Sequence, residues 1–159
     1  MARRLVEAGV RFVQVNWREH PVNEYGFDNH DSNFKRLKDV QAPHVDQTYS
    51  ALITDLKQRG MLERTLVLMT SEFGRTPKIN ANQGRDHWPH VFSYLITGGE
   101  IPGGRVIGAS DQEAAYPADN PVTPENTLAS IFRSVGLDLH KLHKLGILED
   151  KQGIPGLHG

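Results

Sequence analysis

The short apolar run from Leu66 to Met69 is followed at once by a polar, glycine-containing segment, Thr-Ser-Glu-Phe-Gly-Arg-Thr-Pro, at residues 70–77. Four β-prone apolar residues between polar segments are typical of a buried strand. In open α/β sheets, ligands bind outside the carboxyl ends of the strands, so Glu72 lies where such a fold places chemistry. This feature therefore predicts an α/β fold with a functional carboxylate at a strand end.

The rest of the chain alternates expected helices with expected strands. Helices are predicted at 2–8, at 42–60 and from Thr123 to Gly136, where Thr-Pro-Glu is a strong helix start. Strands are predicted at 10–15, 65–70 and 91–97, with a short hairpin arm at 103–108, a polar loop at 109–122 and an irregular tail at 139–159. The alternation favours a mostly parallel sheet flanked by helices. The expected buried faces are Val45, Tyr49, Leu52, Ile53 and Leu56 in one helix and Leu128, Ile131, Phe132 and Val135 in another.

Composition limits the classes of function. The 159 residues carry a net charge of −1, which gives no electrostatic case for binding nucleic acid or a membrane. There is no cysteine, so any metal must be held by histidine and carboxylate groups. No apolar run approaches the roughly 20 residues that span a bilayer, and no apolar segment of a secretory signal follows the basic N-terminus. Localisation is left open.

Three groups of residues are candidates for chemistry. Asp28 and His30 lie in a polar, irregular loop at 17–34 and could ligate one metal, although an Asx-turn with a surface histidine explains them equally simply. Glu72 could be a metal ligand, and Arg75 could hold a phosphate or sulfate through its planar guanidinium, or the two could form a simple ion pair.

The third group is Asp86 and His87, with His90 nearby. It suits a divalent metal, an arrangement in which the acid orients a histidine, or a polar loop folded over Trp88. Taken together, the groups predict that one divalent ion (zinc, manganese, magnesium or calcium) is bound at one edge of the sheet. The expected ligands are Asp28, His30, Glu72, Asp86 and His87. The remaining histidines are expected to be surface residues: His20, His44, His140, His143 and His158.

These motifs, with Thr123-Pro124-Glu125, resemble in order the C-terminal region of the sulfatase-like DUF 1501 family of the alkaline phosphatase superfamily, over residues 1–138. The resemblance implies an alkaline-phosphatase-like α/β fold and metal-dependent hydrolysis of small-molecule phosphate or sulfate esters. It implies that Asp28 and His30 form a metal pair, that His87 with Asp86 completes a site, and that Arg75 binds the anion. Glu72 falls where the superfamily has an Asp-His pair, and Phe73 replaces that histidine.

Members of that family are considerably longer. The part without a counterpart here carries a first strand with a metal-binding aspartate and the segment expected to hold the nucleophile. The resemblance therefore implies an incomplete copy that has no nucleophile of its own, little or no turnover, and apolar surface that favours self-association. The alternative is a non-catalytic α/β domain that binds a metal or an anion.

Overall fold

The structure, a computed structural model, describes residues 1–17 and 26–157. The chain forms two compact units, Met1–Gly60 with Lys78–Asp86 and Met61–Pro77 with His87–Gly159. We call them unit 1 and unit 2. His20, His158 and the middle of the expected 17–34 loop lie outside the described residues.

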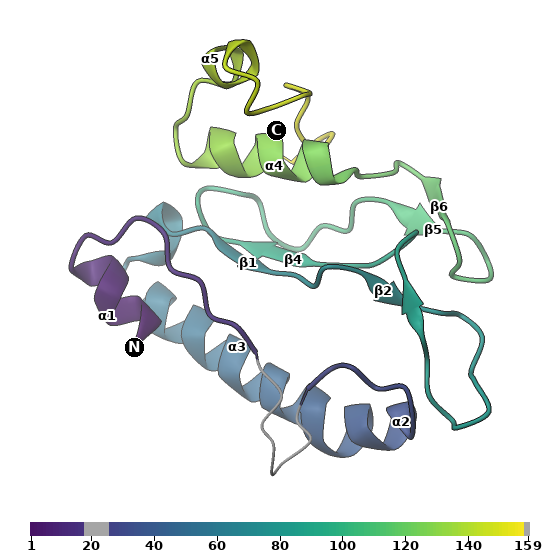
Figure 1. Ribbon diagram of the computed structural model, residues 1–159. Helices are drawn as coiled ribbons and strands as arrows, with labels where there is room; N and C mark the ends of the chain where they lie inside the picture. Colours follow the sequence, from purple (N-terminus) through teal and green to yellow (C-terminus); the bar gives the residue numbers. More distant parts are fainter. Residues whose placement is uncertain (18–25, 158–159) are drawn as a thin grey trace. The chain divides into compact units, whose positions relative to one another are not determined.

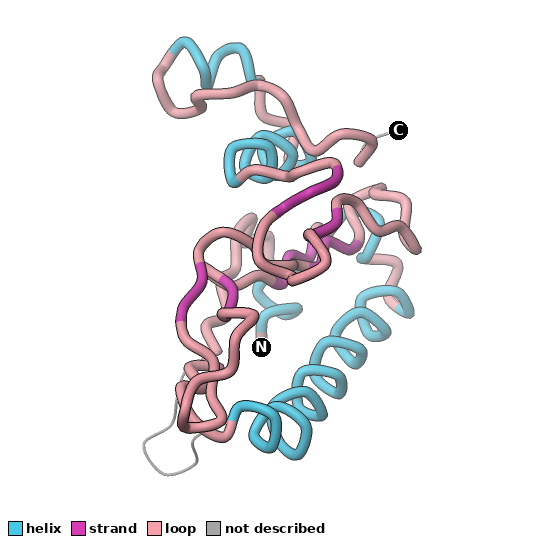
Figure 2. The backbone as a smooth tube through the Cα atoms, turned by 90° about the vertical axis from the view of Figure 1, so that its right-hand side faces the viewer, coloured by secondary structure: helices cyan, strands magenta, loops and turns pink. Residues whose placement is uncertain are grey.

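Unit 1 is mainly helical. Helix α1 (Ala2–Glu7) precedes one continuous helical run made of α2 (Asn33–Arg36), the π-helix η1 (Leu37–Gln41) and α3 (Ala42–Gln58), as Figures 1 and 2 show. Residues 10–15, predicted to be a strand, are coil, so that prediction was wrong.

Proline 43 explains why the helical run contains a π-helix. We expected the helix to begin at Ala42 with Pro43 in its first turn, but helical structure already begins at Asn33. A proline inside a helix has no N–H to donate, and its ring collides with the carbonyl four residues earlier. In the π-helix the spacing is wider, and the Ala42 N–H donates to the carbonyl of Leu37. The extra residue accommodates Pro43 without ending the helix.

The predicted apolar stripe of α3 is confirmed. Leu56 is buried, and the other four members are partly buried. Helix α1 is tied to α3 by an ion pair in which Arg3 Nε lies 2.6 Å from Asp55 Oδ2. Among the described residues, no helix is long and apolar enough to cross a membrane.

The strands of unit 2 form antiparallel pairs, so the prediction of a mostly parallel, alkaline-phosphatase-like sheet was wrong. Strand β1 (Val67–Met69) pairs with β4 (Leu95–Thr97), and β2 (Gly74–Arg75) pairs with β3 (His87–Trp88). Parallel neighbours require a crossover connection of a dozen or more residues, usually a helix. Here the residues between β1 and β4 contain the β2–β3 pair, which reverses the chain and returns it alongside β1 (Figure 1).

A third antiparallel pair lies in the segment expected to be a polar loop. Strand β5 (Ala109–Ser110) pairs with β6 (Pro117–Asp119), with an irregular register between them. The short hairpin arm predicted at 103–108 is not found, because those residues form no strand. Each two-stranded pair is only two or three residues long, which is too short to provide a core by itself.

The core of unit 2 is built on helix α4 (Pro124–Ser134). Its start is confirmed as a capping box, because Thr123 Oγ1 accepts from the Asn126 N–H and the Asn126 side chain accepts from the Thr123 N–H. The predicted buried face was partly wrong. Ile131 and Phe132 are partly buried, and Phe132 packs against the core, but Leu128 and Val135 are exposed and Ala129 and Ser130 are buried instead.

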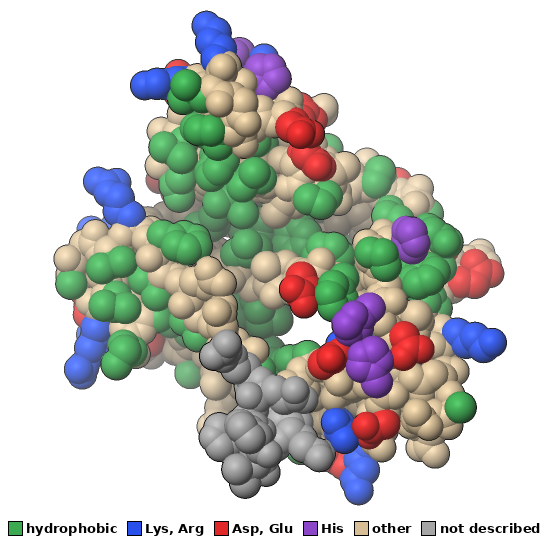
Figure 3. Space-filling view, in the orientation of Figure 1, with side chains coloured by type: hydrophobic (Ala, Val, Ile, Leu, Met, Phe, Trp, Pro, Cys, Tyr) green, Lys and Arg blue, Asp and Glu red, His purple; other side chains and the backbone are tan. Residues whose placement is uncertain are grey.

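The segment after Leu139 explains the rotated face. Where an irregular tail was expected, residues Leu139–Lys144 form α5, and Leu139 and Leu148 form an apolar cluster with Ala129 of α4. The N–H of Ile154 donates to Ser130 Oγ over 2.7 Å. The tail therefore packs on the Ala129 and Ser130 side of α4. Lysine and histidine side chains cover the outer surface of α5 (Figure 3).

Candidate metal centre

The loop that carries Asp28 and His30 is a tight turn around a buried amide. The Asn29 N–H donates to the carbonyl of Phe27, and the His30 N–H donates to that of Asp28. Asn29 is 1% exposed, but the side chains of Asp28 and His30 are 54% and 47% exposed. Burying the middle residue therefore directs its two neighbours outward, where they can bind a ligand.

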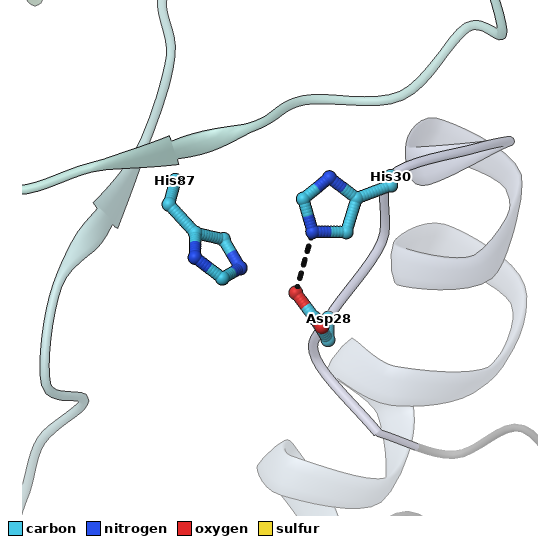
Figure 4. Close-up of side chains that lie close together, drawn as sticks. All are labelled: Asp28, His30 and His87. Atoms are coloured by element: carbon cyan, nitrogen blue, oxygen red, sulfur yellow. Dashed lines mark ion pairs between the residues drawn. The ribbon is translucent and has the colours of Figure 1, made fainter.

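The imidazole of His30 lies between two carboxylates of unit 1. Its Nε2 is 3.0 Å from Asp28 Oδ1, an ion pair drawn in Figure 4, and its Nδ1 is 2.9 Å from Asp86 Oδ1. Asp28 comes from the same turn, whereas Asp86 is 56 residues further along the chain. The structure thus brings together three of the five predicted metal ligands.

A second loop holds Asp86 in place. The side-chain amide of Asn80 donates to Asp86 Oδ1 over 3.1 Å and to the His30 carbonyl over 2.9 Å. The Asn80 side-chain oxygen accepts from the N–H groups of Asn82 and Gly84. Asn80 therefore orders its own loop and links it to the turn of His30.

The backbones of the two loops are also joined. The Arg85 N–H donates to the Asn29 carbonyl, and Asp31 forms an antiparallel bridge with Gln83. Gly84 packs so closely that a Cβ atom there would lie 2.0 Å from the carbonyl carbon and oxygen of His30. Only glycine fits at this contact, which fixes the separation of His30 and Asp86.

The electrostatics of the cluster favour a cation. A neutral imidazole has one N–H and one lone pair, so it can donate to only one of the two carboxylates. The other contact requires a second proton on the ring or a positive ion on its lone pair. An ion with metal–ligand bonds of about 2.1 Å holds adjacent ligands about 3.0 Å apart when they are at right angles. The 3.0 Å separation of His30 Nε2 and Asp28 Oδ1 fits such an ion, and an imidazole with a carboxylate is a suitable donor pair for a transition metal. Asp86 then accepts from the N–H at Nδ1 and orients the ring.

The other predicted site residues belong to unit 2. Glu72 is exposed and lies between β1 and β2, three residues after β1 ends. His87, also drawn in Figure 4, is the first residue of β3 and directly follows Asp86 in the chain. Its ring packs on that of Phe73, with centroids 4.2 Å apart. The prediction that Glu72 and His87 share the site of Asp28 and His30 stays a prediction from the sequence.

Arg75 and His87 are directly opposite each other in the β2–β3 register. Directly opposite residues of an antiparallel pair project from the same face. The guanidinium carbon of Arg75 also lies 6.0 Å from the centre of the Phe73 ring. The pair thus presents an arginine and a histidine side by side.

His90 packs on Trp88, which agrees with the alternative in which this loop folds over the indole. Its ring packs against those of Trp88 and Tyr116, with centroid separations of 4.7 and 4.9 Å. The Trp88 indole N–H donates to the Ala115 carbonyl over 2.6 Å. His90 therefore belongs to an aromatic cluster of unit 2.

Sequence reasoning did not identify two groups that organise the site. One is Asn80, whose Asn-x-x-x-Gly spacing to Gly84 is a recognisable turn signal. Asn29 and Gln41 form a buried amide pair beneath the turn of Asp28 and His30. Nothing in the sequence around Gln41 marks it as buried except Pro43, which signals an irregularity in the helix.

Comparison with known proteins supports one part of the resemblance seen in the motifs, the DUF 1501 family. No curated protein and no solved structure matches the chain. The family model described as "Protein of unknown function (DUF1501)" matches residues 1–153, almost the whole chain. The chain therefore belongs to the DUF1501 family.

Proposed function

We propose that this chain provides a divalent-metal site to a sulfatase-like, metal-dependent hydrolase of phosphate or sulfate esters, related to the alkaline phosphatase superfamily. The observation that carries the proposal is the His30 imidazole held between the carboxylates of Asp28 and Asp86. The proposed relation to the superfamily rests on the order of the motifs and not on the strand arrangement, which is antiparallel.

Each residue of the cluster has a defined role in this proposal. His30 supplies a nitrogen ligand through Nε2, and Asp28 supplies an oxygen ligand beside it and neutralises part of the charge of the ion. Asp86 accepts the hydrogen bond from the opposite ring nitrogen, Nδ1, and orients the imidazole. A bound divalent ion would polarise an ester oxygen and lower the pKa of a bound water. Asn80 keeps Asp86 oriented through its side-chain amide, as partners of metal ligands commonly do.

Arg75 is proposed to bind the anionic group of the substrate. Its planar guanidinium can donate two parallel hydrogen bonds to a phosphate or sulfate. The cross-strand neighbour His87 adds a second donor on the same face of the β2–β3 pair. Glu72 and His87 are also proposed as additional metal ligands, which is the role that their motifs imply.

The second candidate is a domain that binds a metal or an anion without turnover. The hydroxyl groups beside Glu72 favour it, because Thr70 Oγ1 donates to the Ser71 carbonyl and Ser71 Oγ donates to the Phe73 carbonyl. Neither hydroxyl is held by a general base in these contacts, as an activated nucleophile would be. A small-molecule ester as ligand and self-association of the chain both stay predictions.

Titration with Zn²⁺ and Mn²⁺ by isothermal calorimetry tests the metal site. We expect His30→Ala to weaken binding at least tenfold, whereas His140→Ala, which removes an exposed histidine of α5, leaves it unchanged. Binding should also weaken on acidification, because a metal ligates the unprotonated imidazole. His87→Ala tests its proposed role as a further ligand. Equal affinities for the wild-type protein and His30→Ala would refute the site.

A substrate screen distinguishes the two candidates. We expect turnover of p-nitrophenyl phosphate and p-nitrophenyl sulfate by this chain to stay near background with Zn²⁺, Mn²⁺ or Mg²⁺, because no nucleophile was identified. Metal-dependent turnover that disappears in His30→Ala would instead show that these 159 residues contain a complete active site. If inorganic phosphate protects the wild-type protein against thermal unfolding and does not protect Arg75→Ala, the anion-binding role of Arg75 would be supported.

A further inference from the structure

We propose that Gln41, acting through Asn29, is a positioning residue that sets the geometry of the metal site. The inference rests on the proposed function, because it concerns the same site. Neither residue reaches the ion in this proposal. Together they hold the turn whose outward side chains are Asp28 and His30.

The two residues form a reciprocal pair of amides. Asn29 Nδ2 donates to Gln41 Oε1 over 2.7 Å, and Gln41 Nε2 donates to Asn29 Oδ1 over 3.0 Å. Gln41 Nε2 also donates to the carbonyl of Gly26, at the start of the same loop. Gln41 and Asn29 are 0% and 1% exposed, so water does not compete for these bonds.

The position of Asn29 makes this pair specific to the site. Its neighbours in the chain on both sides are proposed ligands, and its carbonyl accepts from the Arg85 N–H, next to Asp86. A shift of the Asn29 side chain therefore moves Asp28, His30 and the attachment of the second loop together. A small displacement would change both the 3.0 Å separation of His30 Nε2 and Asp28, which fits an ion, and the 2.9 Å contact of Nδ1 with Asp86, which orients the ring.

The π-helix places Gln41 at this position. Gln41 is its last residue, and Pro43 follows two positions later. One extra residue in a helix changes the direction of the side chains that follow it by about 100°, the rotation per residue of a 3.6-residue turn. The irregularity that Pro43 imposes on the helix is thus used to direct Gln41 at the loop. Single-turn π-helices are frequent at functional sites for this kind of reason.

The main experiment separates positioning from stability. Gln41→Leu leaves the buried amide of Asn29 without its partner, and we expect it to lower both thermal stability and the affinity for Mn²⁺, the latter at least tenfold. In the double variant Asn29→Leu/Gln41→Leu both amides are replaced by apolar groups, which should restore much of the stability. We expect the double variant to remain folded and still to bind Mn²⁺ at least tenfold more weakly. Recovery of wild-type affinity together with stability would overturn the proposal.

Two further measurements complete the test. Gln47→Leu, a matched change at an exposed glutamine of α3, should leave affinity and stability unchanged. In the metal-free protein, ¹⁵N chemical shifts of the His30 ring should move in Gln41→Leu and in the double variant towards those of exposed His140. Unchanged His30 shifts would refute positioning even if no metal binds. A wild-type protein that binds no Mn²⁺ but shows the expected shifts would refute the proposed function alone.

Discussion

The two units of the molecule bury different kinds of side chain. Among the described residues of unit 1, the buried side chains are largely polar (Asn29, Asn33 and Gln41), and Leu56 is the one buried apolar side chain. In unit 2 most of them are apolar: Met61, Ala129, Leu139, Leu148, Ile154 and Leu157. Apolar burial stabilises a fold without fixing directions, whereas a satisfied buried hydrogen-bond network fixes one arrangement. The comparison teaches that buried hydrogen bonds fix the arrangement of the loops in unit 1, whereas unit 2 is stabilised chiefly by apolar packing.

The largest expected effect, on stability and metal binding together, comes from Gly84→Ala. The new methyl group would collide with the backbone of His30, so the two loops must separate. We expect a loss of about 3 kcal/mol of stability, together with loss of Mn²⁺ binding, because the His30–Asp86 contact depends on this approach. Denaturant unfolding and calorimetry measure the two effects.

Gly103→Ala is the matched control for that variant, because a Cβ atom there meets nothing within 4 Å. Gly103→Ala should leave the stability and the Mn²⁺ affinity close to those of the wild-type protein. Full Mn²⁺ affinity in Gly84→Ala would show that the close packing of the two loops does not determine the site.

The second expected effect tests unit 2. Leu148 is 2% exposed and packs with Ala129 and Leu139, so Leu148→Ala should cost about 2–5 kcal/mol of stability. Leu145→Ala, at a leucine that is 63% exposed, should cost far less. The His30 ring resonances should be unaltered in folded Leu148→Ala. A shift of those resonances would mean that apolar packing in unit 2 also controls the metal ligands.

The smallest expected effect is electrostatic. Asp138 caps α5 and accepts from the N–H groups of Lys141 and His140, which hold the pKa of its carboxyl below the ordinary value of 3.8 despite some desolvation. A depressed pKa in the folded state gives stability that is present above the unfolded pKa and is lost as the pH falls through the folded pKa.

Asp138→Asn isolates this contribution, because asparagine is an equally good helix cap that does not titrate. The melting temperature of the wild-type protein should therefore fall relative to that of Asp138→Asn below about pH 4. If the melting temperatures of the two proteins change with pH in parallel, the charge of the Asp138 cap contributes nothing to stability.

Sequence reasoning succeeded where the signal is local. The apolar stripe of α3 and the start of α4 at Thr123 were predicted, because helix periodicity and capping depend on residues within a few positions of each other. The buried face of α4 was predicted only in part, since Ala129 and Ser130 are covered by the later segment around Leu148 and Ile154. A helix with apolar residues on more than one side does not reveal which side a distant segment will cover.

The amino-acid sequence by itself determined the family, the positions of the main helices and the choice of Asp28, His30 and Asp86 as candidate ligands. Only the tertiary structure decided that the strands pair antiparallel, that His30 meets Asp86 from 56 residues further along the chain, and that Gln41 supports the turn. The physical reason is the separation along the chain between the residues that interact. Helix formation and capping are settled by neighbours in the chain, whereas strand direction and buried hydrogen bonds depend on which distant segments meet.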